Sequence, residues 1–139
     1  MYTYNDGGRE AAGYKGKTGD CVTRAIAIAT GMPYQEVYDA LNEIGHNHER
    51  QKRRGKSNAR TGVFKTAQHR YMASIGWKWT PTMSIGSGCK VHVKASELPQ
   101  GRLVLSLSRH AAAFIDGVLH DTYDSSREGT RCVYGYWTA

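Results

Sequence analysis

Hydrophobic positions follow a helical period in the first half of the chain. In the segments 21–30, 34–44 and 64–75, apolar side chains recur every three or four residues. Gly31 and Gly76 follow two of these segments, and glycine often stands just past the end of a helix. The pattern therefore predicts three helices.

The second half of the chain changes to an extended period, in short stretches separated by Gly, Ser or Pro. Six strands are expected, over residues 77–83, 90–94, 103–108, 110–115, 118–123 and 131–137. Because the helices come first and the strands second, we predict an α+β fold. Its N-terminal helices would pack on one face of a mainly antiparallel C-terminal sheet.

Two segments follow neither period. Residues 1–20 contain five glycines and few apolar residues, which predicts an irregular arm leading into the first helix. Residues 45–60 are polar and basic, which indicates a surface loop or a loose extension of the second helix. The cations of this basic loop form a candidate phosphate-binding patch: Arg50, Lys52, Arg53, Arg54, Lys56 and Arg60. At this length we expect residues 1–139 to form a single domain.

The net charge of +7 favours acidic partners, and a nucleic acid or an acidic protein would bind at the basic loop. No window reaches the roughly 18–20 apolar residues of a membrane span. Residues 1–6 lack the basic and apolar regions of a secretory signal. We therefore expect a cytoplasmic protein that has no membrane partner.

Three cysteines, an odd number without paired spacing, are typical of a reduced compartment. No CxxC pair is present, so we expect no structural zinc. Cys132 falls in a predicted strand and Cys89 directly precedes another, and we expect both to be core residues. Cys21 stands apart, because it opens a predicted helix.

Asp116-Gly117 lies between two apolar stretches, which strongly indicates a β-hairpin with a two-residue turn. In that register His110 and Asp121 lie on the same face of the sheet. Their Cβ atoms are then roughly 5–8 Å apart, a separation that an imidazole and a carboxylate can close. His120 points to the opposite face, so we expect no metal site here, and nothing in the sequence indicates a cofactor.

Cys21 directly follows a turn that contains glycine. A helix N-terminus and a neighbouring imidazolium can lower a thiol pKa from about 8.5 to about 3.5–7.5. Asp20 or Thr18 is placed to cap this helix. Cys21 is therefore the candidate nucleophile, His110 its base and Asp121 the group that orients the base.

These residues resemble the papain-like cysteine peptidase superfamily, in particular its small bacterial and phage members. Residues 20–25, DCVTRA, are similar to the "DCVxRA" helix of those proteins. His110, the pair 116–117 and the pair 121–122 are similar to their "H…DG…DT" hairpin. The resemblance implies a papain-like fold. It also implies hydrolysis of a peptide, isopeptide or related amide bond, in a peptide or protein substrate, through a Cys-His-Asp triad and a thioester.

Papain-like enzymes usually place a Gln before the Cys, where it donates a hydrogen bond to the oxyanion. No Gln precedes Cys21, since the first one in this chain is Gln35. The oxyanion hole would then combine the Cys21 amide with an unusual donor, for which the candidates are Asn5, Tyr14 and Thr18. Loss of one donor commonly costs about 10²–10³ in rate.

Two other functions fit the same residues. A papain-like protein with weak or no catalysis would bind nucleic acid or an acidic protein through the basic loop. A deamidase or a transglutaminase-like acyl transferase would share the triad and differ from a peptidase only in substrate or acceptor.

Overall fold

The computed structural model describes residues 1–15, 19–48, 58–60, 62–63, 65–84 and 86–139. Within these residues lie three helices and one six-stranded mixed sheet, so the fold is mixed α/β. The helices are α1 (Cys21–Thr30), α2 (Tyr34–His48) and α3 (Lys65–Ser74). The strands are β1 (Tyr2–Tyr4), β2 (Lys78–Pro81), β3 (Arg102–Leu107), β4 (His110–Ile115), β5 (Val118–Asp121) and β6 (Gly135–Thr138).

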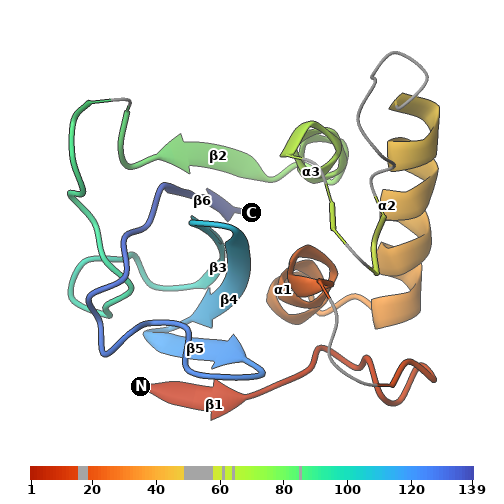
Figure 1. Ribbon diagram of the computed structural model, residues 1–139, viewed down its shortest axis with the longest axis horizontal. Coiled ribbons are helices and arrows are strands. Elements are labelled where there is room, and N and C mark those ends of the chain that lie inside the picture. Colours follow the sequence, from red (N-terminus) through yellow and green to blue (C-terminus); the bar gives the residue numbers. More distant parts are fainter. Residues whose placement is uncertain (16–18, 49–57, 61, 64, 85) are drawn as a thin grey trace.

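The sheet has the strand order β1-β5-β4-β3-β6-β2. Its neighbouring strands are antiparallel except for β1 and β5, which are parallel. Figure 1 shows the three helices on the same side of this sheet. Helix α1 packs against β4 and β3, and α2 packs against both α1 and α3. The arrangement confirms the coarse prediction of helices on a mainly antiparallel sheet.

Helix α1 is buried on nearly all sides, because the sheet covers one side of it and α2 another. Ala25 and Ala29 belong to one core cluster with Ala111 and Ala113 of β4. Such small side chains let the helix approach the sheet closely. A second core cluster holds alternate residues of the strands: Leu103, Leu105, Leu107, Ala112, Phe114 and Leu119. The two clusters therefore occupy opposite faces of β3 and β4.

Two expectations about local structure were wrong. Residues 1–20 are not irregular throughout, because Tyr2–Tyr4 pair with β5 as a parallel edge strand. Three residues are too few to show a period, and their partner lies more than a hundred positions away. Residues 90–94 form no strand and contribute only an isolated bridge between His92 and Cys132. Helix α2 continues to His48, so the first residues of the segment 45–60 extend the second helix, which was one of the two expected alternatives.

Candidate active site

The ends of three elements meet beside the N-terminus of α1. Cys21 is the first residue of α1, His110 is the first residue of β4 and Asp121 is the last residue of β5. Because β4 and β5 are antiparallel neighbours, the start of one lies beside the end of the other. Helix α1 packs on β4 and also contacts β5. The fold therefore brings together the three residues that the sequence placed in a triad.

The β4–β5 hairpin has the register expected from its turn. Asp116 and Gly117 form the two-residue loop, with φ angles of 47° and 83°. Positive φ at both positions is typical of a type I′ turn, whose twist matches that of the strands. The strands then pair Ile115 with Val118 and Ala113 with His120. This turn fixes which side chains of β5 lie opposite the start of β4.

Asp121 accepts a hydrogen bond from His110, with 2.6 Å between Nε2 and Oδ2. The Ser125 hydroxyl donates to the same carboxylate oxygen, and the Thr122 amide donates to the other oxygen. Burial raises the pKa of Asp121, but these hydrogen bonds and the His110 charge outweigh burial and lower the pKa to about 2. Asp121 is therefore a carboxylate at every pH at which the protein would work.

His110 is almost enclosed, with 8% of its side chain exposed. Burial lowers its pKa, but hydrogen bonds and charge interactions with Asp121 and Cys21 outweigh burial and raise the pKa to about 8. Because Nε2 is engaged by Asp121, Nδ1 is the nitrogen that can exchange a proton with a thiol. The imidazole is thus held in one orientation and is mostly protonated at neutral pH.

The Cys21 side chain is half-buried and interacts with His110. Burial raises the pKa of its thiol. The hydrogen bond and charge of His110, the Ala111 amide and the charge of Arg24 outweigh burial, so the pKa of Cys21 lies below its ordinary value. A lowered thiol pKa beside a raised imidazole pKa favours a thiolate–imidazolium pair, which is the reactive form of a nucleophilic cysteine.

A buried ion network supports this site from behind, and the sequence interpretation did not include it. Arg24 Nη1 lies 2.8 Å from Asp121 Oδ1, and Arg24 Nε lies 2.9 Å from Asp20 Oδ1. Asp20, which is fully buried, also accepts hydrogen bonds from Arg9 and from the Tyr34 hydroxyl. The Asp20–Arg24 spacing of four residues on a helix was the sequence feature that could have indicated this pair.

The carboxylate of Asp20 has a different role from the expected helix cap. Asp20 stands at the N-cap position of α1, yet its side chain makes no capping hydrogen bond. Its oxygens are occupied by the ion network instead. The other capping candidate, Thr18, lies outside the described residues.

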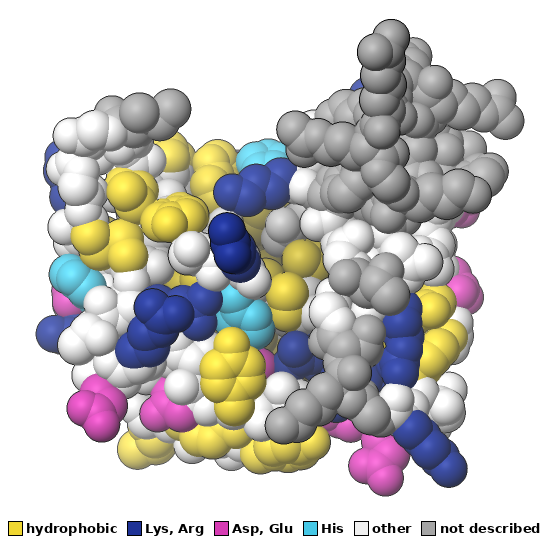
Figure 2. Space-filling model, viewed as in Figure 1, with side chains coloured by type: hydrophobic (Ala, Val, Ile, Leu, Met, Phe, Trp, Pro, Cys, Tyr) yellow, Lys and Arg dark blue, Asp and Glu magenta, His cyan; other side chains and the backbone are white. Residues whose placement is uncertain are grey.

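A pocket of about 290 Å³ opens beside the candidate triad. It is lined by Cys21 and His110 together with cationic and amide side chains, including Lys65, Gln68 and Arg109. On the face shown in Figure 2, Lys and Arg side chains gather around a histidine near its middle. The pocket therefore leaves room for a small chemical group beside the Cys21 thiol.

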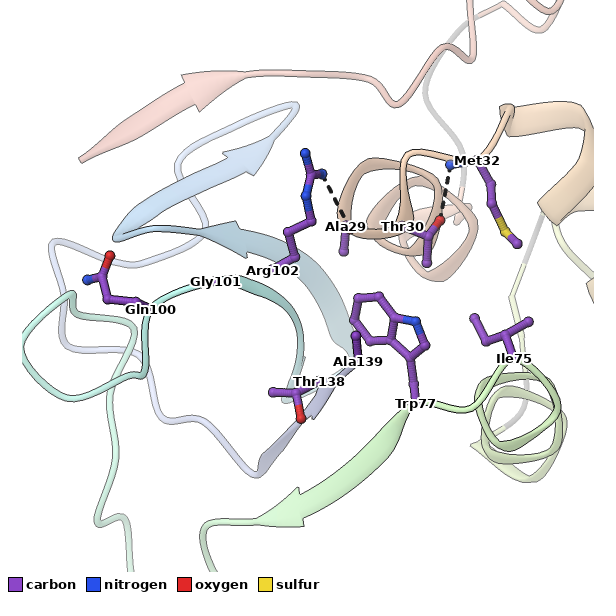
Figure 3. Close-up of a pocket in the computed structure, with 10 residues that line it drawn as sticks. All are labelled: Ala29, Thr30, Met32, Ile75, Trp77, Gln100, Gly101, Arg102, Thr138 and Ala139. Atoms are coloured by element: carbon purple, nitrogen blue, oxygen red, sulfur yellow. Dashed lines mark hydrogen bonds between the residues drawn. The ribbon is translucent and has the colours of Figure 1, made fainter.

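A larger cavity, of about 570 Å³, lies at the other end of α1 (Figure 3). Trp77, Ile75 and Met32 form its apolar part, and the Arg102 guanidinium donates to the carbonyls of Ile28 and Ala29 at the end of the helix. The described residues that line it include no Cys, His, Asp or Glu side chain. The candidate triad therefore does not line this cavity, although it is the larger of the two.

Two of the three oxyanion candidates from the sequence, Asn5 and Tyr14, have side chains that bond to other residues of the protein. The Asn5 amide contacts His120 Nδ1 at 3.3 Å, and its carbonyl oxygen accepts from Gly7. The Tyr14 hydroxyl donates to Gln35 at 2.8 Å, and its ring stacks on Tyr38. Both side chains are thus engaged elsewhere. Thr18 lies outside the described residues.

Among the six cations of the basic patch, Arg60 is the one that lies within the described residues. Its guanidinium lies over the Tyr14 ring and donates to the Lys15 carbonyl. The other members lie outside the described residues: Arg50, Lys52, Arg53, Arg54 and Lys56.

The expectation that Cys89 and Cys132 are unpaired core residues was wrong. They form a disulfide, Cys89 is exposed and Cys132 is half-buried. The bridge between His92 and Cys132 brings two segments of the chain side by side, which the spacing of the cysteines does not reveal. Cys21 is thus the free thiol of the protein.

Comparisons with protein-family models, with curated proteins and with solved structures give no match for this chain. No helix among the described residues is long and apolar enough to cross a membrane. The described residues also contain no group of three or more His, Cys, Asp or Glu side chains that could hold a metal ion. The chemistry of the site therefore has to be judged from its own geometry.

Proposed function

We propose that this protein is a papain-like cysteine hydrolase that cleaves a peptide, isopeptide or related amide bond. The observation that carries the proposal is the arrangement of a free thiol at a helix N-terminus and a histidine bonded to a buried carboxylate, which line the same pocket. The fold supports it, because the N-terminus of α1, the start of β4 and the end of β5 form the site together.

The reaction would begin with attack of the Cys21 thiolate on the carbonyl carbon of the scissile amide. The carbonyl electron pair moves to oxygen and gives a tetrahedral oxyanion. As this intermediate collapses, the carbon–nitrogen bond breaks and the His110 imidazolium gives its proton to the leaving amine. Water then attacks the thioester and gives a proton to His110, and the thiolate leaves with its electron pair. Asp121 holds the imidazole in place through both steps.

Alkylation with iodoacetamide over a range of pH tests this proposal. The Cys21 thiolate is stabilised by His110, so the wild-type protein should be alkylated at Cys21 well below pH 8.5. The His110→Ala variant should be alkylated only at higher pH. His120→Ala is the matched control, because His120 lies on the same hairpin and contacts Asn5 instead of the triad. Peptide mapping that found equal labelling in wild type and His110→Ala would contradict the proposal.

The amide that is attacked distinguishes a peptidase from a deamidase, and the acceptor of the acyl group distinguishes both from a transglutaminase-like enzyme. We expect water as the acceptor and a backbone or isopeptide amide as the substrate. Mass spectrometry of a glutamine-containing peptide library after incubation would show cleaved fragments in that case. Deamidated glutamines without cleavage would assign a deamidase, and amine adducts would assign an acyl transferase.

The net charge of +7 favours a second candidate function, the binding of nucleic acid or an acidic protein. Binding of this kind falls steeply with salt and does not need the thiol. Retention on heparin at low salt that is unchanged in Cys21→Ala would support it, and flow-through at low salt would rule against it.

A further inference from the structure

We propose that the side-chain amide of Gln68 donates a hydrogen bond to the oxyanion formed at Cys21 and so completes the oxyanion hole. This inference rests on the proposed function and names a catalytic residue that the sequence interpretation did not contain. A tetrahedral oxyanion needs donors that are already in place when its charge develops. The Cys21 amide lies in the first turn of α1, where helix amides have no intrahelical acceptor, and can supply one of them.

Gln68 is a polar residue on the buried face of α3. Its exposed fraction is 6%, whereas Lys65, Thr66 and His69 around it are exposed. Gln68 shares the buried face of α3 with Tyr71 and Met72, at the helical spacings of three and four residues. The helix therefore turns this side chain inward, toward the sheet and the N-terminus of α1.

The amide nitrogen of Gln68 is enclosed, and it has no hydrogen-bond partner in the described part of the chain. A buried amide donor without an acceptor costs free energy, so nearly all buried side-chain amides are paired in folded proteins. Gln68 also lines the pocket that holds Cys21 and His110. A donor without an acceptor, in the pocket where an anionic oxygen would form, has the chemistry that an oxyanion requires.

Two cationic side chains of the pocket could also donate to the oxyanion. Lys65 precedes Gln68 by one helical turn and lies over the Tyr134 ring, with 5.8 Å between Nζ and the ring centroid. Arg109 stands in the turn between β3 and β4. Both are exposed, and hydrated surface cations stabilise an oxyanion less than an enclosed dipole does. The enclosed amide of Gln68 is therefore the better placed donor.

The test compares two reactions of Cys21 that differ in whether an oxyanion forms. Acylation by p-nitrophenyl acetate passes through a tetrahedral oxyanion, whereas alkylation by iodoacetamide displaces iodide at a saturated carbon and forms none. Gln68→Met keeps the side-chain volume and removes the donor. We expect it to lower the acylation rate by about 10²–10³ and to leave the alkylation rate within about twofold of wild type. Gln68→Glu, which replaces the donor by an acceptor, should lower acylation at least as much.

Gln35→Ala and Arg70→Met are the controls. Gln35 is an exposed glutamine on α2, and Arg70 is an exposed residue on the same helix as Gln68 that does not line the pocket. Neither change should affect acylation by more than about threefold. Unchanged acylation in Gln68→Met, a parallel fall of both reactions, or a loss in Lys65→Met alone would overturn the inference. A wild-type protein that is not alkylated at low pH would instead overturn the proposed function, and the inference with it.

Discussion

Arg24 and Asp121 form a buried ion pair between α1 and β5, with 2.8 Å between Nη1 and Oδ1. The two residues are 97 positions apart in the sequence. The same carboxylate binds His110 through its other oxygen, and the same guanidinium binds Asp20 through Nε. The helix that carries Cys21 is thus tied to the strand that orients its base. We infer that Arg24 is a positioning residue that holds the Cys21 thiol and the His110 imidazole in place relative to each other.

The Arg24→Met variant should lose about 3–5 kcal/mol of unfolding free energy, because it leaves two buried carboxylates with fewer partners. Its Cys21 pKa should also rise, since the Arg24 charge lowers that pKa in the folded protein. Urea unfolding and the pH profile of alkylation measure the two effects. Arg70→Met, at an exposed position of α3, should change neither. A stability loss in Arg24→Met as small as that in Arg70→Met would refute the positioning role.

The charge of His110 makes stability depend on pH. Because its pKa is raised from 6.5 to about 8 in the folded protein, protonated His110 contributes stability that is fully present below pH 6.5. This contribution, about 1–2 kcal/mol, is lost as pH rises through about 8. The pKa follows from an NMR titration of the imidazole, and the stability from urea unfolding at pH 6 and pH 9.

The Asp121→Asn variant should lower the pKa of His110, because the hydrogen bond and charge that oppose burial are then weakened. It should also flatten the pH dependence of stability above pH 6.5. Asp124→Asn serves as the control, since the Asp124 carboxylate bonds Ser126 within its own turn. A His110 pKa that stays near 8 in Asp121→Asn would show that Asp121 does not stabilise the positive charge of His110.

The turn between β4 and β5 can be tested at Gly117. Its φ of 83° lies in the left-handed region, and an added Cβ would come within 3.1 Å of the Ala95 Cβ. Gly117→Ala should therefore destabilise the protein by about 1–2 kcal/mol in thermal or urea unfolding. Asp116→Asn keeps both the positive φ and the acceptor for the Gly101 amide, and should cost much less. Equal stability of the two variants would mean that the turn does not constrain the hairpin.

The Cys89–Cys132 disulfide closes a long loop, with a sequence separation of 43 residues. Its loss in Cys132→Ser should lower the unfolding free energy by about 2–4 kcal/mol. Alkylation of Cys21 at low pH should stay as it is in wild type, since neither cysteine of the disulfide lines the pocket beside Cys21. Three titratable thiols in the purified, oxidised protein would contradict the disulfide.

The local sequence was enough to predict the β4–β5 hairpin and the residues that pair within it. Alternation along the two strands and the turn at Asp116-Gly117 act over a few residues, so they set the register without help from the rest of the fold. That register is enough to place His110 beside Asp121. The helical period around Cys21 likewise defines α1, because a buried helix shows its own apolar pattern.

Contacts between distant segments could not be predicted from the local sequence and became visible in the folded structure. The pairing of β1 with β5, the disulfide between Cys89 and Cys132, and the inward turn of Gln68 join segments whose local sequences carry no sign of one another. From the sequence alone, Arg24 is one residue of a predicted helix. The fold places the carboxylates of Asp20 and Asp121 beside its guanidinium. Hydrogen bonds and ion pairs of this kind depend on where whole elements pack, and packing is a property of the entire chain.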